Sequence, residues 1–174
     1  MSSDQLIAVA TDALRGLIQS ALPAGSAVLV GPPSPGAGDA SGLFVHLIRV
    51  GTIPALRQAP PVLRADGVRL RPQIGLQLDY LVSGLGGEAL EELGLLGAAL
   101  QVLGDSPVRE SHSLSALLSQ PERLAALAPG SATLQWRVLD LPVEQVSGVW
   151  LASGMRQRGG MFCRAEAVWQ AVQV

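Results

Sequence analysis

The sequence predicts an α+β fold: a mixed, mostly antiparallel sheet of about four to six strands, flanked by two or three helices. Three observations predict it. Segments with the two-residue period of half-buried strands alternate with segments of helical period. Hydrophobic residues make up 48% of the 174 residues, which is enough for the core of one domain. Gly and Pro, with 20 and 12 copies, fall between the periodic segments. We therefore expect a single domain over residues 1–174.

The N-terminal part is predicted to hold one helix and two strands. Apolar residues recur at helical spacing over residues 4–21, and Leu22-Pro23-Ala24-Gly25 ends that helix. Residues 26–30 and 43–50 are rich in apolar and β-branched residues, so we expect strands there. Between them, the Gly- and Pro-rich segment near residues 31–42 is expected to be a flexible loop. The alternative, a phosphate-binding loop, needs a helix directly after it, which the strand pattern disfavours.

A second flexible loop is predicted near residues 52–71, which contain Pro54, Pro60 and Pro61. This segment carries four arginines against a single acid, Asp66. We expect either a solvated loop or a loop that contacts an acidic partner surface. The four arginines are Arg57, Arg64, Arg69 and Arg71.

The clearest strand is predicted over residues 73–84, where side chains alternate between two faces. Asp79 lies among apolar residues of this strand. Because a buried carboxylate is costly without a partner, we expect Asp79 to pair with a group such as an Arg. One face is predicted to hold Ile74, Leu76, Leu78, Tyr80 and Val82, and the other Gly75, Gln77, Asp79 and Leu81.

A helix is predicted over residues 88–103. Glu88, Glu91 and Glu92 lie near its start, where the positive end of the helix dipole favours acids. Gly104 ends the helix. We expect a buried stripe made of Leu90, Leu93, Leu96, Gly97, Leu100 and Leu103.

The C-terminal part is predicted to hold two strands and a short helix. Residues 109–129 are ambiguous, with two possible helical turns, and residues 132–139 alternate like a strand. Pro142 opens a short helix, and residues 161–174 form a closing strand. One side of the helix is expected to hold Val143, Val146, Val149 and Trp150. On the closing strand, Phe162, Arg164, Glu166, Val168 and Gln170 are expected to face opposite to Cys163, Ala165, Ala167, Trp169 and Ala171.

Composition and charge disfavour several classes of partner. The net charge of −2 is too small to attract nucleic acid or anionic lipid. No stretch approaches the roughly 20 apolar residues of a membrane span, and the start of the chain lacks the basic residues of a signal peptide. We therefore expect cytoplasmic assembly, no nucleic-acid partner and no membrane insertion. All twelve basic residues are Arg, which indicates either codon bias or interfaces rich in planar cations.

No set of residues predicts an active site. His46 and His112 have no metal ligand at a suitable spacing, and the single Cys163 lies in an apolar alternating segment, where a buried thiol is expected. The sequence also lacks the Gly-x-Ser-x-Gly turn of hydrolases and any pair of carboxylates on one face. We predict no enzyme, and no catalytic, metal or cofactor-binding residues.

Four blocks of sequence span nearly the full chain. The first is Ile7–Leu17 with the following strand and Gly31-Pro32-Pro33, and the second is Arg71–Ser83, a turn and a strand that contains Tyr80-Leu81. The third is Leu95–Val108, a Leu-Gly helix before Pro-Val, and the fourth is Leu141–Trp150, a short Leu/Glu/Trp helix. Together, and in this order, they resemble the cap, or tail-terminator, family of contractile injection systems, which has an Arg-Pro-Pro turn in the second block.

The resemblance implies a tail-terminator-like fold and a structural role. Such a protein ends the inner tube and contractile sheath as a homo-oligomeric ring, expected here to have six copies, and binds the terminal tube and sheath subunits. The particle that carries it is either released or kept inside the cell. The alternative is a non-enzymatic adaptor or assembly chaperone that binds a baseplate, tube or cargo component. The predicted contact residues are Arg57, Arg64, Arg69, Arg71, Arg164, Glu166 and Trp169.

Overall fold

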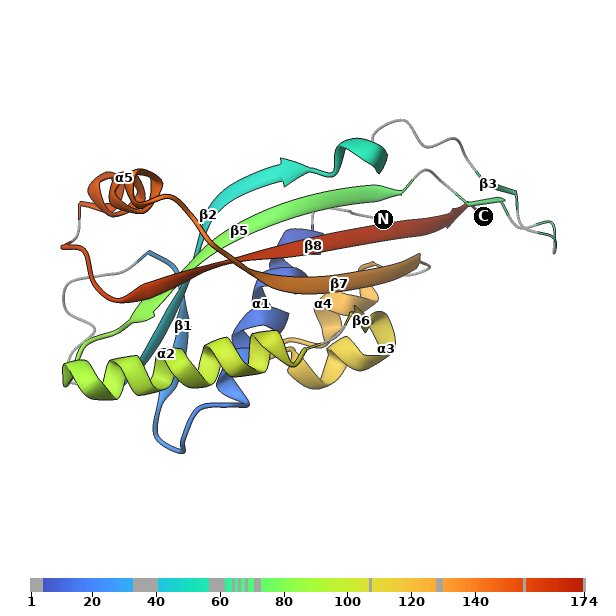
Figure 1. The fold of residues 1–174 in the computed structure, drawn as a ribbon. Coiled ribbons are helices and arrows are strands. Elements are labelled where there is room, and N and C mark those ends of the chain that lie inside the picture. Colours follow the sequence, from blue (N-terminus) through green and yellow to red (C-terminus); the bar gives the residue numbers. More distant parts are fainter. Residues whose placement is uncertain are drawn as a thin grey trace.

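A curled sheet runs the length of the molecule, with most helices on one of its faces (Figure 1). The computed structural model describes residues 5–32, 41–56, 62–63, 65, 67, 69–70, 73–106, 108–127, 130–154 and 156–173. The main sheet has the order β1-β2-β5-β8-β7-β6, in which only the β1–β2 pair is parallel. Its strands are β1 (Ala27–Val30), β2 (Gly42–Thr52), β5 (Ile74–Gly84), β6 (Arg109–Glu110), β7 (Gly130–Leu139) and β8 (Gly160–Gln173).

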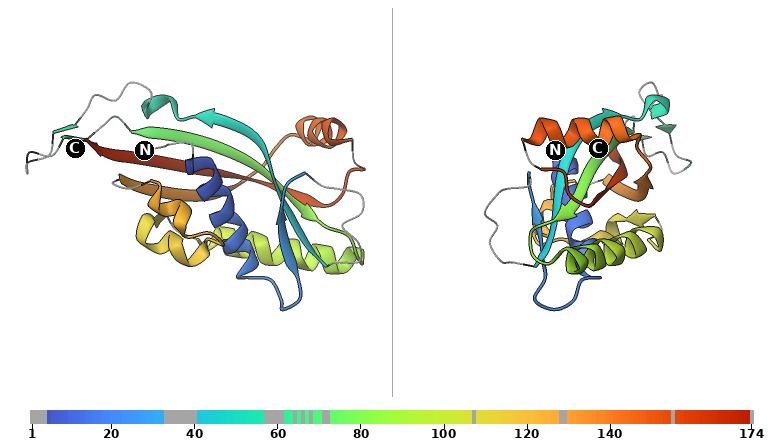
Figure 2. Two further views of the ribbon diagram at one scale, coloured as in Figure 1. Left: turned by 180° about the vertical axis from the view of Figure 1, so that it is seen from behind. Right: turned by 60° about the vertical axis from the view of Figure 1, so that its left-hand side comes forward.

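The helices complete a mixed fold that confirms the predicted class. Three helices exceed ten residues: α1 (Gln5–Gln19), α2 (Ala89–Gly104) and α5 (Val143–Ser153). Helices α1 and α2 lie under the sheet, whereas α5 lies on the opposite side, near one end (Figure 2). The ambiguous segment between α2 and β7 forms short turns: α3 (Ser111–Leu114), η2 (Ser115–Leu117) and α4 (Glu122–Ala125).

Helix α1 is the central element of the core. Eight of its 15 residues are buried, since apolar side chains at helical spacing form one stripe toward the sheet. The Thr11 hydroxyl lies 2.9 Å from the Tyr80 hydroxyl on β5, so the only polar group in that stripe is satisfied. A Cβ at Gly16 would collide with the backbone carbonyl oxygen of Leu117, so η2 can approach α1 only at a glycine.

Helix α2 corrects the predicted stripe. Only Leu95, Ala99 and Leu103 are buried along it. Leucines occur on nearly every side of this helix, so the spacing alone did not determine which side packs on the sheet. Three leucines of the predicted stripe are instead exposed, with exposed fractions of 74% for Leu90, 55% for Leu93 and 48% for Leu100.

The segment expected to be a flexible loop near residues 52–71 contains regular structure in its described parts. Pro54–Leu56 form one 3₁₀ turn, η1. Strands β3 (Val62–Leu63) and β4 (Arg69–Leu70) form a hairpin, and β4 pairs with the end of β8. Backbone pairing with the long closing strand explains this order, and the local sequence carries no sign of it because the partner is about 100 residues away. Most of the other predicted loop, near 31–42, lies outside the described residues.

A second, smaller core lies on the other face of the sheet. It consists of Leu81, Trp150 and Phe162, which pack α5 against β5 and β8. Val146 and Val149 are partly buried beside it, as the predicted side of α5 requires, but Val143 is 68% exposed. Helix α5 thus covers one end of this face. Toward the other end, the side chains of Ile53 and Leu56 lie over Gly75 of β5. We call the part between them the open face, because no other helix of the described residues packs there.

Candidate functional site

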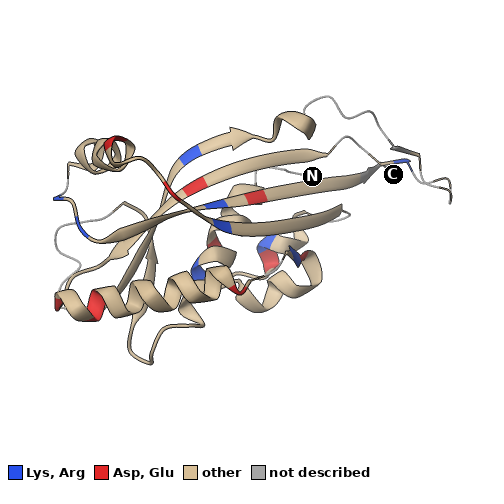
Figure 3. Cartoon of the chain, viewed as in Figure 1, with Lys and Arg blue, Asp and Glu red and all other residues tan. Residues whose placement is uncertain are grey.

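The open face of the sheet carries a band of charged and amide side chains. Residues on β5 and β8 alternate, so Leu78, Tyr80 and Cys163 point into the core while Asp79 and Arg164 point to the open side. Figure 3 shows the charged positions crossing the neighbouring strands β2, β5, β8 and β7. We define the open-face band as Arg49, Gln77, Asp79, Arg137, Arg164 and Glu166.

Asp79 is the centre of this band. Its carboxylate accepts two hydrogen bonds from Arg164, one of them 3.0 Å from Nη2 to Oδ2, and a third, 2.7 Å, from Arg49 Nε. Burial alone would raise the pKa of the Asp79 carboxyl, but the hydrogen bonds and charges of Arg164 and Arg49 outweigh it and hold the pKa below its ordinary value. The partner expected for the buried Asp79 is therefore a pair of arginines, Arg164 and Arg49.

A second ion pair continues the band. Arg137 Nη2 on β7 lies 3.1 Å from Glu166 Oε1 on β8, and Gln77 donates to the same oxygen across 3.4 Å. The arginines at the two ends of the band keep more than half of their side chains exposed, with fractions of 57% for Arg49 and 55% for Arg137. This band can present fixed charges to a partner surface without rearrangement, because the acids already hold the arginines in place.

The β1 edge of the sheet is partly closed by a side chain. Ala27 N–H donates to the carbonyl of Ser41, directly before β2, so the backbone polar groups of Ser26 and Val28 point to the outer edge. There the Gln19 amide replaces a neighbouring strand: its Oε1 accepts from Val28 N–H and its Nε2 donates to the Ser26 carbonyl, both at 2.9 Å. An incoming strand would have to displace this side chain.

The opposite edge is more open. Strand β6 pairs only with Thr133 and Leu134 of β7. No other strand of the described chain pairs with the far edge of residues 135–139. These residues therefore offer backbone donors and acceptors to a strand from another chain.

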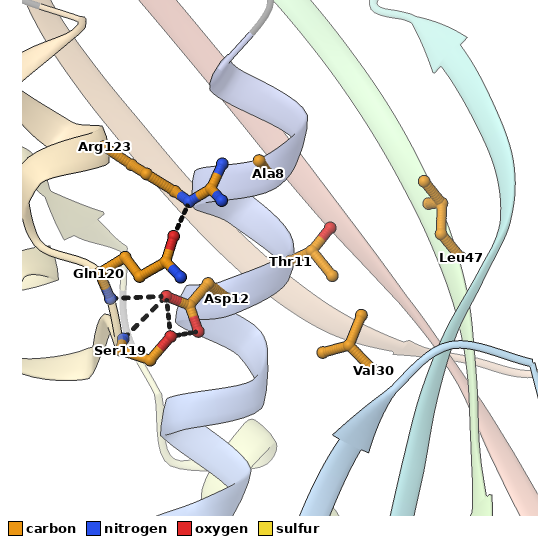
Figure 4. Close-up of a pocket in the computed structure, with 8 residues that line it drawn as sticks. All are labelled: Ala8, Thr11, Asp12, Val30, Leu47, Ser119, Gln120 and Arg123. Atoms are coloured by element: carbon orange, nitrogen blue, oxygen red, sulfur yellow. Dashed lines mark hydrogen bonds between the residues drawn. The ribbon is translucent and has the colours of Figure 1, made fainter.

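A pocket of about 370 Å³ lies beside α1, between α4 and the β1–β2 pair (Figure 4). Its acid, Asp12, is already engaged: Oδ2 accepts from Ser119 N–H at 2.8 Å, and Oδ1 accepts from Arg15 Nε at 2.8 Å. Burial would raise the pKa of Asp12, but the hydrogen bonds from Arg15 and Ser119 hold it below its ordinary value. Asp12 thus holds the segment before α4 against α1. Among the described residues that line this pocket, there is no second carboxylate or histidine for proton transfer.

Comparison with known proteins identifies the family. A family model described as the Pvc16 N-terminal domain matches residues 10–171. The chain belongs to the Pvc16 N-terminal domain family. No curated protein matches the chain.

Two solved structures resemble this member of the Pvc16 N-terminal domain family. One is the sheath/tube terminator, in the extended state, of the extracellular contractile injection system PVC; its TM-score is 0.64 at 12% identity, over 97% of this chain and 57% of that chain. The other is the tube-terminating cap of the anti-feeding prophage, AFP, with a TM-score of 0.60 at 11% identity, over 94% of this chain and 54% of that chain. The chain thus spans little more than half the length of these two terminators.

In this Pvc16 N-terminal domain, the predicted contact residues are divided between faces. Arg164 and Glu166 lie together in the open-face band, while Trp169 lies on the covered face, 5% exposed, with its Nε1 donating to the Leu127 carbonyl at 2.9 Å. The alternation along β8 already placed Trp169 opposite to Arg164, and here it is a core residue. Arg69 is exposed on β4. The remaining three, Arg57, Arg64 and Arg71, lie outside the described residues, and a contact role for the predicted set stays a prediction.

Other groups of possible chemical interest have structural explanations in this domain. Cys163 is fully buried, and burial raises the pKa of its thiol to about 12, so the thiolate is scarce near neutral pH. His112 is exposed beside Glu110. In the described ranges, no group of three or more His, Cys, Asp or Glu could hold a metal ion. Among these same residues, no helix combines the length and apolar character needed to cross a bilayer.

The residues that the sequence analysis missed act through side-chain hydrogen bonds to distant backbone. Gln19 and Asp12 both lie on the polar side of α1, where a sequence pattern indicates only solvent. Their partners, Val28 and Ser119, are fixed by tertiary folding. The signal for Asp79 was stronger, because an acid within an apolar strand requires a partner.

Proposed function

We propose that this chain is a structural terminator, which ends the inner tube and contractile sheath of a contractile injection system as one subunit of a closed ring of six. The observation that carries the proposal is the similarity of its fold, over 97% and 94% of the chain, to a sheath/tube terminator and a tube-terminating cap. Family membership over residues 10–171 supports it. Its partners in this role are other copies of the chain and the last tube and sheath subunits.

The sheet edges suit this role. A subunit that ends a stack of rings has to accept the last layer and offer no further site for addition. The open edge of β7 can accept a strand from a neighbour, whereas Gln19 occupies the start of the β1 edge. The open-face band gives a second surface with fixed charges, suited to orienting a partner.

We also propose that the protein has a non-enzymatic role, is assembled in the cytoplasm and has no nucleic-acid partner.

The decisive experiment combines purified chain with preassembled tubes and records its position by negative-stain imaging of a tagged subunit. We expect closed rings at one tube end only, and no further tube growth from that end. Tubes already capped with untagged chain are the control and should bind no tagged chain. Label at the baseplate end or in the lumen would replace this proposal by the adaptor or chaperone hypothesis.

Deleting the gene tests the same proposal in the producing cell. Without a terminator, we expect particles of uncontrolled length or no intact particles, measured as a length distribution in electron micrographs. Restoring the gene should restore the narrow distribution. An unchanged distribution in the deletion strain would contradict the proposal.

A further inference from the structure

Strand β7 has unpaired backbone groups on its outer edge. The N–H of Ala132 donates to the Ser111 hydroxyl, which donates back to the Ala132 carbonyl, on the side away from β8. Because backbone groups alternate along a strand, the N–H and C=O of Trp136 and Val138 point to this same side. No hydrogen bond reaches these groups from any described residue. The edge of β7 is therefore free at two successive outward positions.

Trp136 is the residue of this edge that most needs a partner. It is only 3% exposed, so water reaches its polar groups poorly. Its indole Nε1 is buried and has no hydrogen-bond partner among the described residues. Buried polar groups are nearly always hydrogen-bonded in folded proteins, so this position is incomplete in the single chain. Two residues further on, Val138 is 40% exposed, and the edge is open to solvent there.

A row of leucines on α2 is only partly covered. Its members are spaced i, i+3 and i+7, so they follow one side of the helix. The first and last are 55% and 48% exposed, and the middle one is partly buried against the main core. Apolar side chains gathered in this way are uncommon on a surface that stays in water. We define the leucine row as Leu93, Leu96 and Leu100.

The leucine row lies on the side of α2 that faces the edge of β7. A Cβ at Gly159, directly before β8, would lie 3.3 Å from Leu93 Cδ2 and 3.7 Å from Leu96 Cδ1. On the other side of the helix, Glu91 accepts a hydrogen bond from the Ser41 hydroxyl, directly before β2. In the right-hand view of Figure 2, α2 lies under the sheet on the side of β7 and away from β1. The unpaired edge and the exposed leucines thus belong to the same side of the molecule.

One added strand would satisfy both features. It would lie about 4.8 Å beyond β7 and pair with the outward backbone groups of Trp136 and Val138. Every second side chain of that strand would point to the helix layer, where Leu93 and Leu100 remain half exposed. Main-chain bonds to the edge and alternate apolar side chains over the helix are the features of strand addition.

A second copy of this chain suits the site poorly. Antiparallel pairing of two β7 edges through Trp136 and Val138 would set the Arg137 side chains of the two copies directly opposite each other, which is destabilising. The β1 edge is occupied at its start by Gln19. Strands β3 and β6 have two residues each. The site is therefore better suited to a segment of another protein.

Arg137 also limits the other side of that segment. On the open face, the added strand would lie beside this arginine, which already pairs with Glu166. A basic side chain there would face a like charge, and an acid is not required because the arginine has its partner. Polar, non-basic residues fit this side of the segment.

We propose that the edge of β7 and the leucine row of α2 together bind an extended segment of another protein, with apolar side chains at alternate positions and polar, non-basic ones between them. The segment pairs with the backbone of Trp136 and Val138, and its apolar side chains cover Leu93 and Leu100. The chemistry of this site rests on the chain itself. The source of the segment rests on the proposed function: it is the subunit of the last inner-tube layer, on which a terminator has to sit.

Overlapping short peptides that cover the inner-tube subunit of the same particle test the site on the intact chain. Their binding is measured by fluorescence anisotropy, with peptides of the sheath subunit as the comparison. We expect binding by tube peptides with alternate apolar residues, and loss of binding when proline replaces a central residue, since proline cannot donate to the ladder. In hydrogen exchange, the bound peptide should slow the amides of Trp136 and Val138. The amide of Val28, already bonded to Gln19, should not change.

Val138→Pro tests the backbone part of the site. This N–H has no partner in the single chain, so the variant should keep the wild-type circular dichroism spectrum. It should weaken peptide binding about tenfold or more, because one ladder bond is lost and the proline ring lies against the incoming strand. Val30→Pro is the matched control on β1, since Val30 is also an exposed valine with an outward N–H. That variant should bind the peptide as the wild type does.

Leu100→Gln tests the leucine row without adding a charge. Glutamine keeps the helix propensity, so the unfolding midpoint should stay close to that of the wild type. Binding of the same peptide should weaken about tenfold, because the apolar side chains of the segment lose their contact. Leu90→Gln is the matched control, since Leu90 is 74% exposed on another side of α2. Equal losses from both variants would mean that the row is not part of the site.

The peptide experiments decide the site. Equal affinity of wild type and Val138→Pro for the tube peptides overturns strand addition at β7. Absence of binding by every peptide overturns the whole proposal, and binding by sheath peptides alone overturns the inner tube as the source. Slowed exchange at Trp136 and Val138, together with the two losses of affinity, supports it.

Capping experiments separate the site from the terminator role. Peptide binding by a chain that never caps tubes supports the site and overturns the terminator role. Capping with wild-type yield by both Val138→Pro and Leu100→Gln overturns the site as a tube contact and leaves the terminator role intact.

Discussion

Helices α1 and α2 lie on the same face of the sheet and have nearly the same length, 15 and 16 residues, yet they differ in how much of their surface is buried. Eight residues of α1 are buried and three of α2. Helix α1 is enclosed by the sheet, η2 and α4, while α2 is covered on one side only. The difference separates residues that stabilise the chain from apolar residues that remain available to a partner.

The largest effect is expected where the two helices differ most in burial. Leu14→Ala in α1 should lower the free energy of unfolding by about 3–5 kcal/mol, because Leu14 is fully buried and the substitution leaves a cavity. Leu100→Ala in α2 should change it by less than about 0.5 kcal/mol, because this leucine is half exposed. Urea unfolding of both variants measures the contrast. Equal losses would mean that α2 is enclosed in the isolated chain.

Replacing a glycine by alanine should lower the stability of the chain in α1 and raise it in α2. Gly16→Ala in α1 should destabilise by about 1–3 kcal/mol, because the new methyl group collides with the Leu117 backbone and η2 must move. The loss exceeds any gain in helix propensity. A shift of the thermal midpoint to a lower temperature measures it, and a stabilised Gly16→Ala variant would show that η2 yields easily.

Acid should weaken the attachment of α1 to the α4 segment. The folded-state pKa of Asp12 is lowered, so its stabilisation is present above the ordinary carboxyl pKa of 3.8 and is lost as pH falls through the lowered value. Asp12→Asn should cost about 1–2 kcal/mol at pH 7 and flatten the pH dependence of stability below about pH 5. Urea unfolding at several pH values tests this, with Asp79→Asn as the comparison on the open face. Parallel curves for wild type and Asp12→Asn would contradict this attachment.

The smallest expected effect is a gain in stability. Gly97→Ala in α2 should stabilise the single chain by about 0.5–1 kcal/mol, because alanine favours the helix and its methyl group meets no atom within 4 Å. Calorimetry of the variant and the wild type measures the gain as a rise in the unfolding midpoint. A lower midpoint for Gly97→Ala would contradict the expected gain.

The elements of the fold could be predicted from the sequence where the local spacing of apolar residues determines them. The long strands β5 and β8, with their alternating faces, follow from a two-residue period, and the fold class follows from the order of such segments. The stripe of α2 did not follow, because leucines lie both on the side that packs on the sheet, as Leu95 does, and on the exposed side, as Leu90 and Leu100 do. The resemblance to the terminator family is confirmed over residues 10–171.

The candidate surfaces were predicted less completely. The need of Asp79 for a partner was clear, but its pairing with both Arg49 and Arg164 depends on the register of three strands. Trp169 was placed among the contact residues although the alternation of β8 already put it on the covered face. The hydrogen bonds of Gln19 and Asp12 join residues that no spacing rule connects. Tertiary contacts made by polar side chains of α1 were thus the main omission.

The Gln19 side chain has a consequence for the time before assembly. A newly made subunit waits in a crowded solution with its sheet exposed, and any unguarded edge can capture an extended segment of an unrelated chain. One amide occupies the start of the β1 edge during that interval, in the place of a backbone strand. It satisfies one backbone donor and one backbone acceptor, so neither group is available to an unrelated chain. One edge is thus closed to the wrong neighbours while the edge of β7 can still accept the right one.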